Sequence, residues 1–161
     1  MVRPESLTVV FTDVVGSTAW RFRVGGRAAD ELTIDFDRAC RDVVGNHGGD
    51  VVKSVGDGVI ATFAGAASAF DAAVDLQTVA RRVGVGSGLR VGISSGDLIR
   101  EASDWIGDAA IEASRLCGEA EGGEVLCSDV AVRLGGSRVP YEMRLGLERI
   151  GVRLGSSGRA R

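Results

Sequence analysis

The sequence predicts an α+β fold from three observations: an apolar strand that ends in an acid, a tight hairpin, and amphipathic helices between the strands. Residues 7–13 form an apolar run that closes on Thr12-Asp13, which is typical of a buried strand. Two β-branched runs, 51–55 and 59–63, flank Gly56-Asp57-Gly58, and glycines around an aspartate favour a tight hairpin turn. Between the first strand and the hairpin, residues 27–44 carry apolar side chains at helical spacing with acids mostly on the other side. This pattern predicts a crossover helix.

The remaining elements follow in order. A second helix is expected over residues 66–83, ended by the glycine-rich breaker at 84–88. Residues 89–93 alternate as a fourth strand, and residues 94–105 are expected to form a polar connection. Together these elements give the order β-α-β-β-α-β of the ferredoxin-like split unit. Its helices cover one face of the sheet, so we expect a partner subunit over the other.

Further pieces are appended to this unit. We expect a third helix over 107–118, a strand over 124–127, and a short helix capped by Ser128. Residues 1–150 are predicted to form one domain. The tail 151–161 is rich in glycine, serine and arginine, and we expect it to be disordered.

Composition excludes several classes of function. The net charge of −3, from 19 basic and 22 acidic residues, offers no overall attraction for nucleic acid. No apolar run reaches the length of a membrane span, so a cytoplasmic location is expected. Cys40, Cys117 and Cys127 lack paired spacing, which argues against disulfides and a zinc site. His47 is the only histidine, and a surface position in its glycine-rich loop is expected.

Asp13 and Asp57 are the first candidate site residues. A right-handed crossover makes the first two strands parallel, so the hairpin tip lies at the carboxyl end of the first strand. Two unpaired carboxylates there would repel each other unless a cation lay between them. Carboxylate oxygens suit Mg²⁺ or Mn²⁺, and two such ions are known to assist displacement at phosphorus. For the hairpin alone, the simpler interpretation is that Asp57 is a turn residue and Lys53 a solvated side chain.

Three blocks together resemble the catalytic domain of class III nucleotidyl cyclases. They are Phe11-Thr-Asp-Val-Val-Gly-Ser-Thr18, then Lys53-Ser-Val-Gly-Asp-Gly58, then Asp104-Trp-Ile-Gly107 leading to Glu112-Ala-Ser-Arg115-Leu116. They occur in the family's order, and the resemblance runs from about Thr8 to about Ile150. It implies a bacterial adenylyl cyclase that converts ATP to 3′,5′-cyclic AMP and pyrophosphate. The site would lie at the interface of a head-to-tail homodimer.

The resemblance also implies roles for the candidate residues. Asp13 and Asp57 would hold two divalent cations, Mg²⁺ or Mn²⁺. Lys53 and Asp104 would recognise adenine, since a lysine donates to its unprotonated ring nitrogen and an aspartate accepts from its amine. Arg115 would stabilise charge at the α-phosphate. In isolation, Asp104 is equally a loop acid near a helix start, and Arg115 a solvated arginine with Glu112 or Glu119 as local partner.

The segment after Asp13 is a candidate phosphate-binding turn. If the chain enters a helix there, the backbone N–H groups of Val14, Val15, Gly16, Ser17 and Thr18 can donate to phosphate oxygens at the positive end of the helix dipole. The alternative is an ordinary strand-to-helix turn capped by Ser17.

Two departures from the family pattern affect the expected rate. Ile111 stands where the family usually places an asparagine that holds the ribose. Lys53 is the only lysine, so the usual triphosphate lysine is missing, and Arg144, Arg149 and Arg153 remain as substitutes. We expect a slow cyclase. The alternatives are a weakly active or inactive cyclase-homology module that binds nucleotide or dimerises, and a guanylyl cyclase.

Overall fold

The computed structural model describes residues 3–136, 141–144 and 151–154, and its central sheet has the predicted topology. The strands are β1 (Glu5–Val14), β2 (Asp50–Val55), β3 (Gly58–Phe63) and β4 (Leu89–Glu101), in the order β2-β3-β1-β4. All neighbours in this part are antiparallel, so β1 and β2 run in the same direction with β3 between them. This is the ferredoxin-like order, and it confirms the predicted α+β class.

The sheet extends beyond β4 on one side. The three-residue strand β6 (Val125–Cys127) runs parallel to β4, followed by β8 (Gly151–Leu154) and β7 (Tyr141–Arg144). The expected disorder from residue 151 is therefore wrong for residues 151–154. They form β8 because the free edge of β6 offers unpaired backbone groups to an extended segment. Residues 155–161 lie outside the described residues, as does Arg149.

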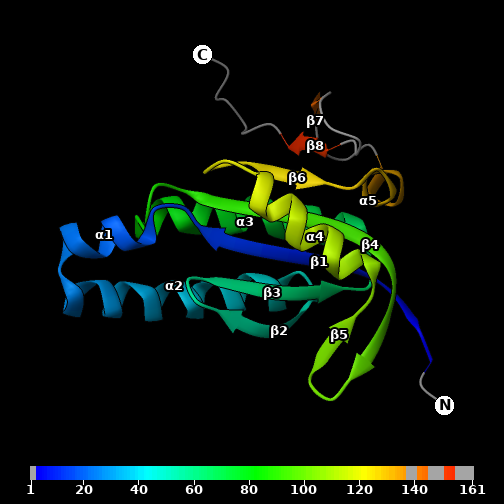
Figure 1. The fold of residues 1–161 in the computed structure, drawn as a ribbon, viewed down its shortest axis with the longest axis horizontal. Coiled ribbons are helices and arrows are strands. Elements are labelled where there is room, and N and C mark those ends of the chain that lie inside the picture. Colours follow the sequence, from blue (N-terminus) through cyan, green and yellow to red (C-terminus); the bar gives the residue numbers. More distant parts are fainter. Residues whose placement is uncertain (1–2, 137–140, 145–150, 155–161) are drawn as a thin grey trace.

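The polar connection expected over residues 94–105 is also wrong. Strand β4 continues to Glu101, and β5 (Asp104–Ile106) pairs back onto it, so the two form an arm that extends beyond the sheet (Figure 1). The N-terminal half of β1 pairs with residues 95–98. This long-range pairing outweighs the low strand propensity of the serines, glycine and aspartate in this segment.

The helices lie on both faces of the sheet, so the expectation that they cover only one face is wrong. The large helices α2 (Gly26–Asn46) and α3 (Ala66–Val83) match their predicted ranges and pack on one face, around Val10 of β1. Helix α4 (Asp108–Glu119) lies on the opposite face, over β1 and β4, where Val9 is buried (Figure 1). Successive strand residues point to opposite faces, so β1 contributes to both cores. The smaller helices are α1 (Ser17–Val24) and α5 (Asp129–Gly135), the latter capped by Ser128 as predicted.

The three cysteines are buried, and the one histidine contacts an aspartate on the next helix. Cys40, Cys117 and Cys127 are free and buried, as expected. Burial raises the pKa of the Cys40 thiol to about 12 and that of Cys117 to about 11, so both stay protonated at neutral pH. His47 follows α2, and its Nε2 lies 2.7 Å from an Asp75 carboxylate oxygen on α3. None of the helices described here has the length and apolar character of a membrane span.

Candidate active site

Asp13 and Asp57 lie at one rim of the sheet. Asp57 is in the two-residue turn between β2 and β3, where Gly56 has the positive φ of 56° that such turns require. The next residue, Gly58, packs directly against the backbone of β1. A Cβ atom on Gly58 would lie 1.9 Å from the Thr12 carbonyl oxygen and 3.2 Å from the Asp13 Cα atom. The structure thus places the two aspartates side by side in the fold, as the crossover argument predicted.

Arg90 also belongs to this rim, and the sequence did not reveal it. It lies on β4 opposite Asp13, and its guanidinium contacts the Asp13 carboxylate at 2.6 Å. The same guanidinium donates to the Gly118 carbonyl oxygen at 3.2 Å. Asp13 is therefore balanced by a neighbouring cation, which weakens the expected repulsion with Asp57. The pairing depends on the β1–β4 register, which has no signal in the sequence.

The rim fits a magnesium-type site with few protein ligands. In the described part of the chain there is no group of three or more histidine, cysteine, aspartate or glutamate side chains that could enclose a metal ion. A cation held by Asp13 and Asp57 would have to complete its coordination with water or phosphate oxygens. Mg²⁺ commonly binds in this way, through one or two carboxylates and the phosphates of a substrate.

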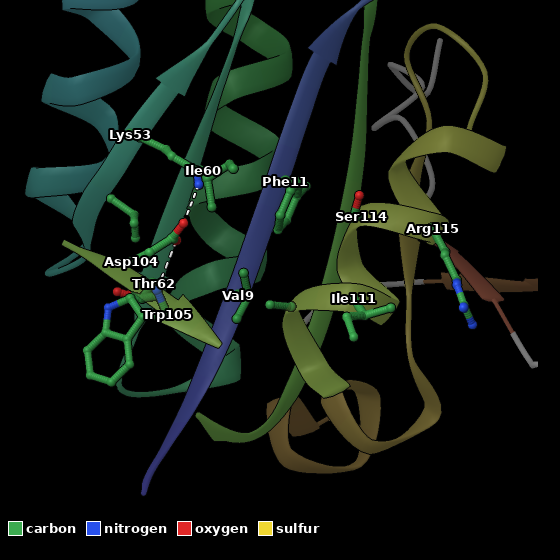
Figure 2. A pocket seen from close by; sticks show the side chains of 12 residues that line it. Val9, Phe11, Lys53, Ile60, Thr62, Asp104, Trp105, Ile111, Ser114 and Arg115 are labelled. Atoms are coloured by element: carbon green, nitrogen blue, oxygen red, sulfur yellow. Dashed lines mark hydrogen bonds and ion pairs between the residues drawn. The ribbon is translucent and has the colours of Figure 1, made fainter. Parts of the chain in front are cut away.

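A groove of about 460 Å³ lies on the face of the sheet that carries α4 (Figure 2). Its floor comes from β1 and β3, one wall from β2 and β5, and the other from α4. The lining residues are Val9, Phe11, Val52, Lys53, Ile60, Thr62, Asp104, Trp105, Ala110, Ile111, Ser114 and Arg115. The groove is mostly apolar, with charged groups at its two ends, as is usual for a small-molecule site.

Lys53 and Asp104 form an ion pair at one end of this groove. The Lys53 ammonium donates to an Asp104 oxygen at 2.5 Å, and the Trp105 backbone N–H donates to the other oxygen at 2.9 Å (Figure 2). These two hydrogen bonds, that of Lys53 first, lower the pKa of Asp104. Both side chains remain almost half exposed, at 45% and 47%. A ligand in the groove can therefore reach both.

A β-bulge in β2 is the reason that Lys53 lines the groove. The register of β2 against β3 shifts between Val51 and Lys53, leaving Val52 as the extra residue. In a regular strand, Val52 and Lys53 would point to opposite faces, but here both line the groove. Ser54 faces the other way and hydrogen-bonds to Asp37 on α2. The sequence showed the lysine in an apolar strand but not the bulge.

Ile111 and Arg115 lie at the other end, one turn apart on α4. The Ile111 side chain is 53% exposed and forms part of the wall. Arg115 is exposed and makes no ion pair within the described residues, so Glu112 and Glu119 are not its partners. Figure 2 shows Arg115 projecting away from the Lys53–Asp104 pair. The structure thus pairs Lys53 with Asp104 at one end of the groove and places Arg115 at the other end.

The predicted phosphate-binding turn is shorter than expected. Val14 still belongs to β1, and the Val15 N–H donates to the Gly88 carbonyl oxygen at 2.9 Å. Including Val15 was wrong because the pairing of β1 with β4 continues past the end of the strand. Gly16 is the N-cap of α1, without a side-chain capping bond, so Ser17 is not the cap. The segment from Gly16 to Thr18 remains a candidate.

Comparisons with other proteins give no matching family model but several cyclase relatives. The putative adenylate cyclase 3 of Rhizobium meliloti is 30% identical over 134 residues, which is 80% of this chain and 23% of the relative. The adenylate cyclase of Streptomyces coelicolor is 33% identical over 110 residues, which is 68% of this chain and 29% of the relative. The chain therefore spans less than a third of the length of these two relatives.

Two solved structures share the fold over almost their whole length. The adenylyl cyclase CyaB from P. aeruginosa superposes with a TM-score of 0.86 and 20% identity, covering 99% of this chain and 98% of CyaB. The guanylyl cyclase Cya2 gives a TM-score of 0.82 with 17% identity, covering 98% of this chain and 95% of Cya2. The fold, with its acidic rim and neighbouring groove, is that of a nucleotide cyclase domain. With its sequence relatives, the chain belongs to the class III nucleotidyl cyclase catalytic domains.

Proposed function

We propose that the chain is the catalytic domain of an adenylyl cyclase that converts ATP to 3′,5′-cyclic AMP and pyrophosphate. The observation that carries this proposal is the Lys53–Asp104 pair at one end of the groove. The curated relatives are named adenylate cyclases, whereas the solved structures of the same fold include adenylyl and guanylyl cyclases. Because the fold occurs in both adenylyl and guanylyl cyclases, the preference for ATP or GTP is inferred from the residues that line the groove.

The pair supplies the hydrogen bonds that adenine needs. The Lys53 ammonium donates to the unprotonated ring nitrogen, and the Asp104 carboxylate accepts from the exocyclic amine. Guanine presents an N–H at the ring nitrogen and a carbonyl oxygen in place of the amine. It would set donor against donor and acceptor against acceptor, and unpaired polar groups in a binding site reduce affinity strongly. We therefore favour ATP over GTP.

Asp13 and Asp57 would hold two divalent cations, Mg²⁺ or Mn²⁺. When bound, these ions would lower the pKa of the ribose 3′-hydroxyl and neutralise the triphosphate. The chain itself adds the Arg90 guanidinium beside Asp13 and the N–H groups at the start of α1, both of which suit phosphate oxygens. The nucleotide supplies its own nucleophile, so positioning and charge neutralisation are the main tasks of the protein.

A second copy of the chain would complete the site. Asp13 and Asp57 are not among the residues that line the groove, so one chain presents its acids and its base-binding residues on separate surfaces. In a head-to-tail homodimer, the rim of one copy would face the groove and Arg115 of the other, giving two equivalent sites. The lack of an ion-pair partner for Arg115 among the described residues is consistent with a role at the α-phosphate.

The second candidate is a nucleotide-binding or dimerisation module with little or no turnover. Ile111 supports it, because its exposed hydrocarbon side chain cannot hydrogen-bond to a ribose lying along this wall. Guanylyl cyclase activity is less favoured because of Lys53 and Asp104.

An assay of the purified chain with Mn²⁺ and either ATP or GTP separates these functions. We expect cyclic AMP and pyrophosphate from ATP and much less product from GTP. Asp13→Asn and Asp57→Asn should abolish turnover, whereas Asp50→Asn, an exposed aspartate at the far end of β2, should not. Binding of ATP without any cyclic product would favour the module, and a preference for GTP would contradict the base assignment.

A further inference from the structure

The Thr12 side chain ties β1 to the hairpin next to the two aspartates. Its Oγ1 accepts from the Val59 backbone N–H at 2.8 Å and donates to the Val59 carbonyl oxygen at 3.1 Å. Thr12 is 6% exposed and Val59 is 2% exposed, so water does not compete for these groups. One hydroxyl thus satisfies both backbone groups of Val59.

This contact lies next to the two candidate cation ligands in the fold. Thr12 directly precedes Asp13, and Val59 is two residues after Asp57. Between them, Gly58 has no side chain, and its Cα lies so close to β1 that a Cβ atom would overlap the Thr12 carbonyl oxygen at 1.9 Å. The Thr12–Val59 contact and the close approach of Gly58 thus hold β1 against the hairpin at the rim, beyond the last backbone pair at Phe11 and Ile60.

We propose that Thr12 is a positioning residue for Asp13 and Asp57. Its hydroxyl holds β1 against the start of β3, so that two carboxylates from separate chain segments share one cation site. The inference rests on the proposed function, because it takes the two aspartates as cation ligands. Groups that orient metal ligands typically change metal affinity by about 10- to 100-fold when they are removed.

Thr8 offers a matched comparison on the same strand. It lies four residues before Thr12, so its side chain leaves β1 on the same face. It is also buried, at 2% exposed, and its Oγ1 lies 2.7 Å from the Ser95 Oγ on β4. Loss of the Thr8 hydroxyl removes a buried hydrogen bond from β1 without touching the hairpin. A general effect of lost hydroxyls would appear in both variants.

The test compares Thr12→Val, Thr12→Ser and Thr8→Val in the full chain. Valine keeps the shape of threonine and removes the hydroxyl, whereas serine keeps the hydroxyl. Mn²⁺ binding is measured by electron paramagnetic resonance without nucleotide, and exchange of the Val59 amide proton is measured without metal. We expect Thr12→Val to weaken Mn²⁺ binding at least about tenfold and to speed exchange at Val59. Thr12→Ser and Thr8→Val should bind Mn²⁺ like the wild type.

Mn²⁺ binding and cyclic AMP formation by the wild-type protein distinguish failure of the proposed function from failure of the role of Thr12. If wild-type protein neither binds Mn²⁺ nor forms cyclic AMP, the proposed function fails, and the role of Thr12 fails with it. If the wild type does both, but Thr12→Val binds Mn²⁺ equally well or Thr8→Val weakens binding as much, only the role of Thr12 is overturned. If Thr12→Val does not fold, Thr12→Ala takes its place. Alanine leaves room for a water molecule at the Val59 backbone groups, which allows the protein to fold, and the expected results are the same.

Discussion

At the scale of single residues, the Lys53–Asp104 pair is the feature on which the proposed preference for adenine depends. In the absence of nucleotide, each side chain satisfies the other, at 2.5 Å. Both are almost half exposed, so the pair contributes little to folding. The contact instead keeps a donor and an acceptor side by side at one end of the groove. A base with an acceptor beside a donor could therefore meet this pair without a large rearrangement of either side chain.

Lys53→Met should lower kcat/KM for ATP by about 10- to 100-fold, because a hydrogen bond to a charged group contributes about 1.5–3 kcal/mol. Arg38→Met, which removes an exposed cation from α2, should leave kcat/KM unchanged. As Lys53 is the only lysine, an amine-specific reagent followed by mass spectrometry reports directly on this side chain. Bound ATP should protect it. Equal labelling with and without ATP would rule out contact between Lys53 and the base.

The pKa of Asp104 gives a pH-dependent prediction. The Lys53 hydrogen bond and the Trp105 N–H hold this pKa below its ordinary value of 3.8. A carboxyl group whose pKa is lower in the folded state stabilises the fold at pH values above its unfolded-state pKa. This contribution disappears as the pH falls through the folded-state pKa. Lys53→Met removes the main cause, so the pKa of Asp104 should rise in this variant. At neutral pH the Lys53→Met variant should be slightly less stable than the wild type, and this difference should vanish at pH values below 3.8.

An NMR titration of the Asp104 carboxyl in both proteins checks the shift. Urea unfolding at neutral and acid pH checks the stability difference. An unchanged Asp104 pKa in Lys53→Met would show that the ion pair does not form in solution.

Asp13 and Asp57 were proposed from the crossover argument, whereas Lys53 and Asp104 were proposed as a pair from the resemblance to class III cyclases. Arg90 was missed, although it contacts Asp13 at 2.6 Å. A cross-strand partner is fixed by strand register, and arginine in an alternating strand has no distinctive context. The role of the Thr12 hydroxyl was invisible for the same reason, since Val59 lies on another strand.

At the scale of elements, helix α4 carries one wall of the groove and packs very closely on β4. A Cβ atom on Gly92 would lie 2.1 Å from the Ala113 carbonyl oxygen and 2.3 Å from the Cys117 backbone nitrogen. Only glycine permits this distance between strand and helix. The position of Arg115 relative to the rest of the groove therefore depends on Gly92, although Gly92 does not line the groove.

Gly92→Ala should destabilise the protein by about 1–3 kcal/mol, because the helix must move to admit the methyl group. It should also weaken ATP binding, since α4 moves with Arg115. Gly118→Ala is the matched control within α4, where a Cβ atom meets nothing within 4 Å. It should stabilise the helix by up to about 1 kcal/mol. Urea denaturation of both variants measures the difference, and equal stabilities would contradict the close packing.

Helices α2 and α3 were predictable because their apolar residues recur at helical spacing over several turns. Strand β5 was not, because Asp104, Trp105 and Ile106 form a strand only by pairing with the distant end of β4. Helix α1 has little amphipathic pattern, and its Phe22 side chain is 86% exposed. Such elements depend on tertiary pairing more than on local propensity.

At the scale of the whole molecule, the split β-α-β-β topology brings the two aspartates together. The right-handed crossover is a general rule, so this meeting could be predicted from the order of elements alone. The position of the groove could not, because it depends on the bulge at Val52 and on the packing of α4. The resulting molecule presents the acidic rim and the groove of Lys53 and Asp104 on separate surfaces. We propose that two copies of the chain join these surfaces into one site.

A mixture of two inactive variants shows whether two chains share the site. Asp57→Asn removes an acid from the rim, and Arg115→Ala removes the guanidinium at the end of the groove, so each protein alone should be inactive. After equal mixing and exchange, half of the dimers are mixed, and each contains one intact site of two, which should restore about a quarter of wild-type cyclic AMP formation. A mixture that stays inactive, although both variants fold and exchange subunits, would show that the site is not shared between two chains.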